Sequence, residues 1–244
     1  MRLPLPIAAA AIALLLAACS SPAAPSPTKH GAKPAASASS ASSLAVATLT
    51  GAQLDAALAH ASSFPGFTVI TKYAYQGGTG TGALPSQYSL ARMSCTRFST
   101  QILFATEFGQ TAIAWTPFTR VTGAQSNQNY DEFIYQFADD GTASSFMQRL
   151  RSDYRRCRSY TDVEDGYTVR TTYVVAHVAP VAGGQAIQVT VTAVASPLTV
   201  AGEVLYVLSR NVVYGVVRVG TGTTIPASPA ARAVIKGMMK QVQA

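Results

Sequence analysis

The residues best suited to bind a charged ligand are five arginines that cluster along one predicted helix: Arg149, Arg151, Arg155, Arg156 and Arg158. With 3.6 residues per turn, Arg151, Arg155 and Arg158 share one flank of that helix, whereas Asp153 partly neutralises the other flank. Planar guanidinium groups bind carboxylates and phosphates through paired hydrogen bonds. We therefore predict that Arg151, Arg155 and Arg158 contact an anionic ligand or wall polymer. The alternative interpretation is a solvated helix face.

Aromatic residues form a second group of candidates in the same region: Trp115, Phe118, Phe133, Tyr135, Phe137, Phe146 and Tyr154. Large rings in such numbers usually build a core rather than a ligand platform. Trp115 and Tyr135 each carry a polar atom that needs a partner, so we predict that these two line a ligand-binding cleft.

The sequence contains no motif of a known catalytic centre. G-x-S-x-G, H-E-x-x-H and P-loop patterns are missing, and the one S-x-x-K match, Ser26 to Lys29, lies in a Ser/Ala/Pro-rich segment. His30, His60 and His177 lack neighbours at the spacing of a metal site. We therefore predict no catalytic residue, no metal and no cofactor, with an enzyme of unfamiliar type as the remotest alternative.

The N-terminus has the features of an export signal. Met1 and Arg2 precede an apolar run over Ile7–Leu16, which is shorter than the roughly 20 residues of a membrane span. Leu16-Ala17-Ala18-Cys19 resembles the bacterial lipobox. The resemblance implies cleavage before Cys19 and a diacylglyceryl group, with acyl chains such as palmitate, joined to its sulfur as a thioether. We predict a lipoprotein signal peptide over residues 1–18, with ordinary signal cleavage and an incidental Cys19 as the alternative.

Composition divides the mature chain into a tether and one domain. Residues 19–47 contain the acylated cysteine and a Ser/Ala/Pro-rich stretch that cannot bury enough apolar surface to fold. Three of the 18 basic residues precede position 48, which leaves 15 against 11 acidic residues in a single domain over residues 48–244. This weak positive charge does not indicate nucleic-acid binding.

Cys95 and Cys157 are the cysteines that remain in the domain after lipidation of Cys19. An exported chain with two such cysteines is expected to oxidise them, so we predict a Cys95–Cys157 disulfide. A redox-active pair is the alternative, although the close C-x-x-C spacing is missing.

The pattern of strands and helices indicates an α+β fold. Phe133–Phe137 alternates like a strand and leads through Asp139 into a helix whose apolar stripe ends at Cys157. A strand-rich half follows, with expected strands at 167–178, 186–195, 204–208 and 212–219, and Ser228 and Pro229 open a last helix. Other expected strands lie at 67–75, 101–108 and 111–118, and Thr50 caps a first helix. Short connections favour a central antiparallel sheet with the helices packed mainly on one face.

Several segments together resemble a known family: Cys95-Thr96-Arg97-Phe98, Tyr130–Phe137, Thr142-Ala143-Ser144-Ser145-Phe146 with Cys157, and Ser209-Arg210-Asn211-Val212-Val213. They are similar to the extracellular sensor domain of the mycobacterial serine/threonine kinase PknH and its stand-alone lipoprotein relatives, over roughly residues 48 to 243. The resemblance implies an α+β domain with an antiparallel sheet, a ligand cleft and a family disulfide at Cys95 and Cys157. This chain lacks the cysteines of a second family disulfide, the kinase domain and the transmembrane helix.

We therefore predict an extracytoplasmic lipoprotein, held at the cell membrane by the acyl chains on Cys19, with a non-catalytic ligand-binding or sensor-like domain. The principal alternative is a protein-interaction or structural module of the cell envelope, whose partner would be an envelope protein. A cleft lined by polar and aromatic groups would favour binding, and a flat apolar patch would favour a protein partner.

Overall fold

The computed structural model describes residues 48–58, 64, 66–70, 73–76, 94–96, 110–123, 126–164, 166–225 and 230–243. The helices are α2 (Gly51–Ala57), α4 (Asp140–Arg156) and α5 (Ala231–Val242). The strands are β1 (Thr68–Val69), β2 (Tyr73–Gln76), β3 (Gln110–Gly123), β4 (Ser126–Phe137), β5 (Ser159–Glu164), β6 (Tyr167–His177), β7 (Gln185–Ala195), β8 (Leu198–Ser209) and β9 (Val212–Thr221).

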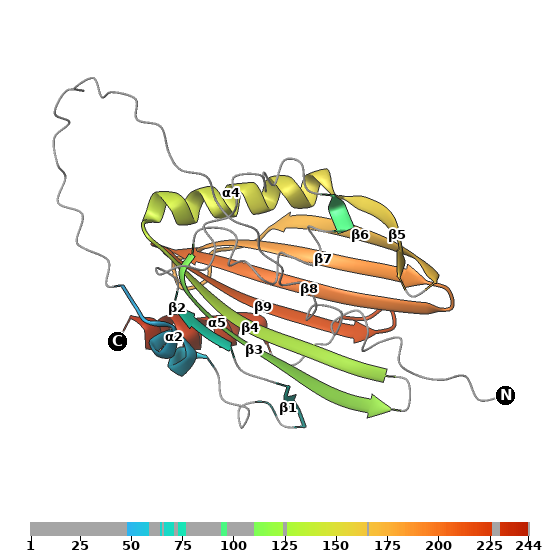
Figure 1. Ribbon diagram of the computed structural model, residues 1–244, viewed down its shortest axis with the longest axis horizontal. Helices are drawn as coiled ribbons and strands as arrows, with labels where there is room; N and C mark the ends of the chain where they lie inside the picture. The colour runs from blue at the N-terminus through green and yellow to red at the C-terminus, as the bar shows by residue number, and fades with distance from the viewer. Residues whose placement is uncertain are drawn as a thin grey trace, which may run out of the picture.

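These strands form one nine-stranded antiparallel sheet in the order β1-β3-β4-β9-β8-β7-β6-β5, with β2 also paired to β3 (Figure 1). The chain passes from β4 into α4, which crosses the sheet so that β5 becomes the far edge. The meander from β5 to β9 then returns, and β9 pairs with β4. The predicted α+β fold with a central antiparallel sheet is confirmed.

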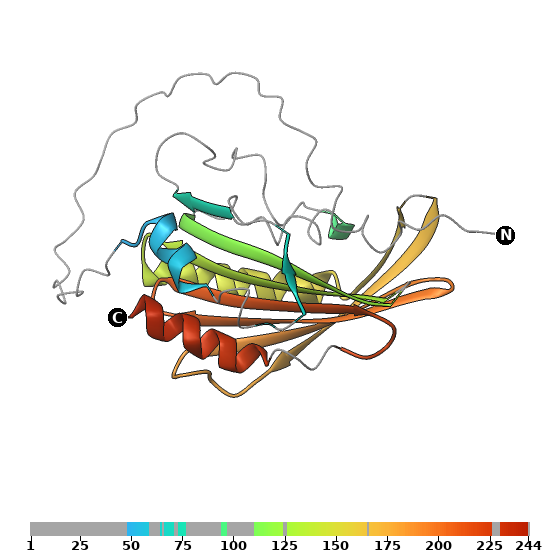
Figure 2. The ribbon, with the colours of Figure 1, turned by 90° about the horizontal axis from the view of Figure 1, so that it is seen from below.

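The prediction that the helices pack mainly on one face is wrong, because each face of the sheet has its own core. Side chains of α4 pack with Phe133, Tyr135 and Phe137, whereas those of α2 and α5 pack with Ile134 and its neighbours on the opposite face. Figure 2, which views the sheet from below, shows α5 in front of the strands and α4 behind them. A sheet covered on both faces needs apolar residues at consecutive positions, as Phe133, Ile134 and Tyr135 supply.

Helix α4 begins and packs as its sequence indicates. The side chain of Asp139 accepts a hydrogen bond of 2.7 Å from the backbone N–H of Thr142, and this contact lowers the pKa of Asp139. The predicted stripe is buried in full: Ala143, Phe146, Met147, Leu150, Tyr154 and Cys157. At its far end the hydroxyls of Tyr154 and Tyr206 lie 3.1 Å apart, which ties α4 to β8.

Several element boundaries differ from the prediction. Residues 126–129, which were expected to form a loop, are the first residues of β4. Polar residues can form strand at the end of a hairpin that extends beyond the core. β8 begins at Leu198 rather than at residue 204, and β5 was not predicted because its six residues are largely polar. Helix α5 begins at Ala231 with Ala230 as its N-cap. Ser228, Pro229 and the expected strand at 101–108 lie outside the described residues. The predicted cap of the first helix by Thr50 is confirmed.

The close approach of β4 and β9 depends on a glycine beneath Phe133. Gly215 pairs with Phe133, and a Cβ at position 215 would overlap the Phe133 ring. The ring stacks on Tyr135 with 4.7 Å between centroids, so it has little room to move. We expect Gly215→Ala to lower the free energy of unfolding by roughly 1 to 3 kcal/mol in urea denaturation.

Gly237→Ala is the matched control for that substitution. A Cβ at position 237 meets no atom within 4 Å, and alanine is a better helix former than glycine. This variant should be as stable as the wild type or more so. Equal stability of Gly215→Ala and the wild type would show that the Phe133 ring repacks freely.

Candidate functional site

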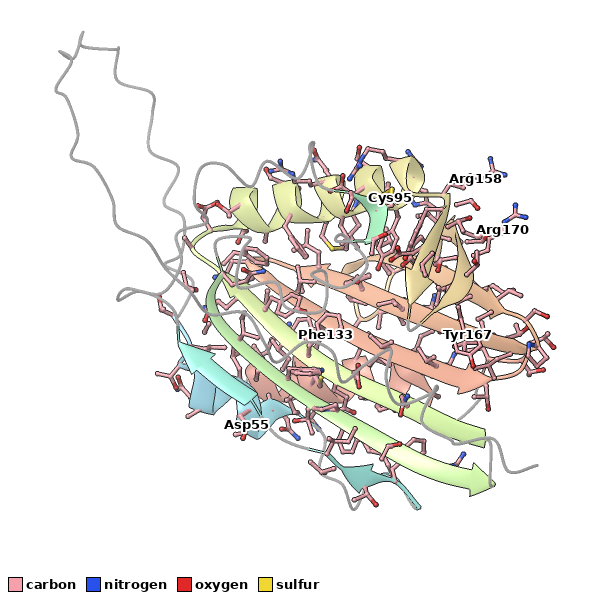
Figure 3. All side chains as sticks on the ribbon, turned by 45° about the vertical axis from the view of Figure 1, so that its right-hand side comes forward. Asp55, Cys95, Phe133, Arg158, Tyr167 and Arg170 are labelled. Atoms are coloured by element: carbon pink, nitrogen blue, oxygen red, sulfur yellow. A yellow bond between two sulfur atoms is a disulfide. The ribbon has the colours of Figure 1, made fainter. Side chains whose placement is uncertain are left out.

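The disulfide predicted between Cys95 and Cys157 is confirmed. The two Cα atoms lie 5.3 Å apart, and Cys157 is the C-cap residue of α4. Cys157 is fully buried, and Cys95 packs against the same core on the α4 face. Figure 3 shows Cys95 beneath the C-terminal part of α4. The bond therefore ties the end of α4 to a segment that precedes the long hairpin of β3 and β4.

The two aromatic residues predicted for a cleft wall lie in the core beneath α4. Trp115 on β3 is 9% exposed, and Tyr135 on β4 is 1% exposed. Both belong to the core cluster that packs against α4. A direct contact with a ligand stays a prediction for both residues.

The predicted arginines lie elsewhere, on α4 and just after it. Arg151 is half-buried, while Arg155 and Arg158 are exposed. No ion pair joins these three guanidinium groups to another described residue, whereas Arg156 pairs with Asp153 at 3.3 Å, as the spacing predicted. Figure 3 shows Arg158 and Arg170 projecting outward at the same end of the molecule. Their binding of an anion stays a prediction.

The charged groups inside the α5 face of the sheet form a structural network. Arg218 on β9 pairs with Glu203 on β8 at 2.7 Å, and the second carboxylate oxygen of Glu203 accepts a hydrogen bond of 2.7 Å from Gln188 on β7. Both oxygens of Glu203 are therefore occupied by protein groups. This arrangement holds three strands together and leaves no evident position for a ligand on Glu203.

A pocket of about 410 Å³ lies at the end of the sheet where α2 begins and α5 ends. Its lining comes from three separate parts of the chain: Leu49, Ser209, Arg210, Asn211, Val212, Tyr214, Val242 and Gln243. Figure 1 shows α2 and α5 together at this end. The volume falls in the range of pockets that hold small molecules.

Two hydrogen bonds and the hairpin turn fix the shape of the pocket. The backbone N–H of Leu49 donates to Oε1 of Gln136 at 2.8 Å, which holds the chain entering the domain against β4. Nδ2 of Asn211 donates to the carbonyl oxygen of Phe137 at 2.8 Å, which holds the β8–β9 turn against the end of β4. The pocket is thus built on rigid elements rather than on a free loop.

The polar groups of the pocket are buried to different degrees. Asn211 is 2% exposed, and its Oδ1 has no hydrogen-bond partner within the part of the chain that the structure describes. Tyr214 is 1% exposed, and burial raises the pKa of its hydroxyl, which therefore keeps its proton. Arg210 is exposed and has a φ of 54°, a left-handed conformation that favours glycine.

The sequence identified Arg210 and Asn211 only as a turn, and Tyr214 only as part of a strand. No pattern in the sequence places Leu49 beside residues 209–214 and 242–243. The unusual signal is an arginine in a two-residue hairpin turn where glycine or asparagine is common.

Among the described residues, no group of three or more His, Cys, Asp and Glu side chains could hold a metal ion. None of the described helices is long and apolar enough to cross a membrane.

Comparison with known proteins gives a structural likeness alone. No family model and no curated protein matches this sequence. The extracellular domain of PknH from Mycobacterium tuberculosis superposes with a TM-score of 0.53 at 18% identity, over 80% of this chain and 97% of that domain. An uncharacterized protein from Mycobacterium smegmatis gives a TM-score of 0.31 at 13% identity, over 80% of this chain and 95% of the other. The chain thus shares the fold of the PknH extracellular domain.

Proposed function

We propose that this chain is an extracytoplasmic lipoprotein, anchored through Cys19, whose domain binds a small ligand without catalysing a reaction. The observation that carries the proposal is the Cys95–Cys157 disulfide, since structural disulfides persist in oxidising compartments outside the cytoplasm. The lipobox-like sequence before Cys19 agrees with export. The fold shared with an extracellular domain is compatible with the same location.

The binding part of the proposal is supported by the pocket beside α2 and α5. Hydrogen bonds of Asn211 and Gln136 hold its shape. Its described lining residues include Arg210 and Tyr214 but no pair of a nucleophile and a base. Such a site can hold and orient a small molecule. The lining residues that the structure describes include no carboxylate, histidine or cysteine that could transfer a proton or form a covalent intermediate.

Replacement of Cys19 by alanine tests the anchor. We expect the wild-type chain to sediment with membranes and the Cys19→Ala chain to appear in the soluble or secreted fraction, because the acyl chains supply the membrane affinity. Ser20→Ala, which changes the next residue and spares the thiol, serves as the control and should remain with membranes. A Cys19→Ala chain that still sediments with membranes would contradict the anchor.

Native purification tests the binding function separately. The mature chain is extracted from membranes in mild detergent, and the molecules that are released on its denaturation are identified by mass spectrometry. The proposal expects a small molecule in stoichiometric amount. Release of a stoichiometric protein partner instead would favour the envelope interaction module.

A further inference from the structure

The pocket beside α2 and α5 carries one positive charge and a set of oriented polar groups. Among the described residues that line it, Arg210 alone has a charged side chain, and its guanidinium makes no ion pair with another described residue. A guanidinium at a pocket rim binds a carboxylate in a bidentate manner. A single positive charge is matched by a single negative charge on the ligand.

Other lining residues of the pocket favour hydrogen-bond donors on the ligand. Val242 and Gln243 belong to the C-terminal end of α5, where the last carbonyl groups of a helix lack partners within the helix and carry partial negative charge. Oδ1 of Asn211 is a further acceptor that has no partner among the described residues. Leaving such a buried acceptor unsatisfied costs free energy, which a bound N–H group would recover.

Apart from Ser209, the remaining described lining residues are largely apolar. Leu49, Val212 and Val242 contribute aliphatic side chains, and Tyr214 adds a buried ring. A ligand that fits this arrangement carries a carboxylate at one end, an N–H donor near it and an aliphatic group between the walls.

The backbone of Arg210 supports a role beyond packing. Its φ of 54° is strained for any residue with a side chain, and glycine would adopt it at no cost. Strained residues persist where the surrounding structure fixes them, and they concentrate at binding sites. Arginine at this position therefore lowers the stability of the turn and adds a guanidinium to the pocket.

We propose that this pocket binds an apolar amino acid or dipeptide, with its carboxylate on Arg210 and its amino or amide N–H on Asn211 Oδ1 and the C-terminal carbonyls of α5. The proposal rests on the binding function proposed above and names its ligand class. Because Leu49 lies two residues after the end of the predicted tether, the bound ligand would lie where the domain joins its anchor.

The test uses L-leucyl-L-leucine as the probe and the detergent-purified mature chain as the protein. Isothermal titration calorimetry and the shift in melting temperature are measured for this dipeptide, its C-terminal amide and its N-acetyl derivative. We expect the dipeptide to bind, the amide to bind at least tenfold more weakly, and the N-acetyl form to be intermediate. Equal affinity for the dipeptide and its amide, or no response to the dipeptide, overturns the proposal.

Two variants separate binding from folding. Arg210→Gly should weaken dipeptide binding at least tenfold while the melting temperature stays the same or rises, because glycine relieves the left-handed backbone. A folded Arg210→Gly chain that binds the dipeptide as the wild type does would refute the assignment of the carboxylate.

Ala182→Gly is the matched control for the backbone effect. Ala182 has a φ of 48° in the exposed turn between β6 and β7, far from the pocket in sequence. It should gain stability as Arg210→Gly does and keep full dipeptide affinity. If no dipeptide binds but native purification yields another small molecule, the ligand class is wrong and the binding function stands.

Discussion

Replacing Cys95 and Cys157 together with alanine is expected to lower the free energy of unfolding by about 4 kcal/mol. The disulfide closes a loop with a sequence separation of 62, so its loss lets the unfolded chain explore many more conformations. Urea denaturation of the mature chain measures the change. We also expect a larger dependence of stability on urea, because an unlinked unfolded chain exposes more surface.

Reduction of the wild type separates the bond from the packing. Cys157 is fully buried at the C-terminal end of α4, so alanine at this position also removes a packed sulfur atom. The wild type in dithiothreitol keeps both sulfur atoms and loses only the covalent link. Similar destabilisation of the reduced wild type and the double variant would assign the effect to the link. A double variant within about 1 kcal/mol of the oxidised wild type would contradict the loop-closure argument.

The local structure between Phe133 and Cys157 could be predicted from sequence because short-range chemistry decides it. Alternating aromatic residues, the Asp139 cap and a six-residue apolar stripe each act within a few positions along the chain. The disulfide followed from the number of cysteines and the predicted export. Each of these features depends either on residues that are close together in the sequence or, for the disulfide, on the single possible pairing of two cysteines.

The placement of the helices could not be predicted in the same way. Helices α4 and α5 each have one apolar stripe, and neither stripe indicates which face of the sheet its helix covers. The face that α4 covers depends on its crossing the sheet to reach the edge strand β5. That strand was not predicted, because most of its residues are polar. The pocket was missed for a related reason, because Leu49, Arg210 and Val242 meet only after the sheet and both helices are assembled.

Asp131 is expected to make the domain less stable as the pH rises from about 4 to about 7, and Asp131→Asn is expected to abolish that loss. Asp131 lies on β4 between Pro117 and Val217, on the face covered by α4, and is 6% exposed. Burial raises the pKa of its carboxyl group from 3.8 to about 7. Two phenols on the same strand couple electrostatically to Asp131: that of Tyr135, four residues further along on the same face, and that of the neighbouring Tyr130.

The sign follows from which state of the protein holds the proton. Between a pH of 3.8 and about 7 the unfolded chain ionises Asp131 while the folded domain keeps it protonated, so rising pH favours unfolding. Each pKa difference of one corresponds to about 1.4 kcal/mol, so the full loss is about 4 kcal/mol and is complete above a pH of about 7. Below a pH of about 4 the carboxyl is neutral in both states and contributes nothing.

Urea denaturation of the wild type and Asp131→Asn at several pH values between 4 and 8 measures this difference directly. Asparagine matches the neutral carboxylic acid in shape, so the variant should be more stable than the wild type at pH 8 and nearly equal to it at pH 4. Asp140→Asn removes an exposed carboxylate from the first turn of α4 and controls for the loss of one negative charge. A stability difference between Asp131→Asn and the wild type that is constant with pH would mean that Asp131 ionises in the folded domain as it does in the unfolded chain.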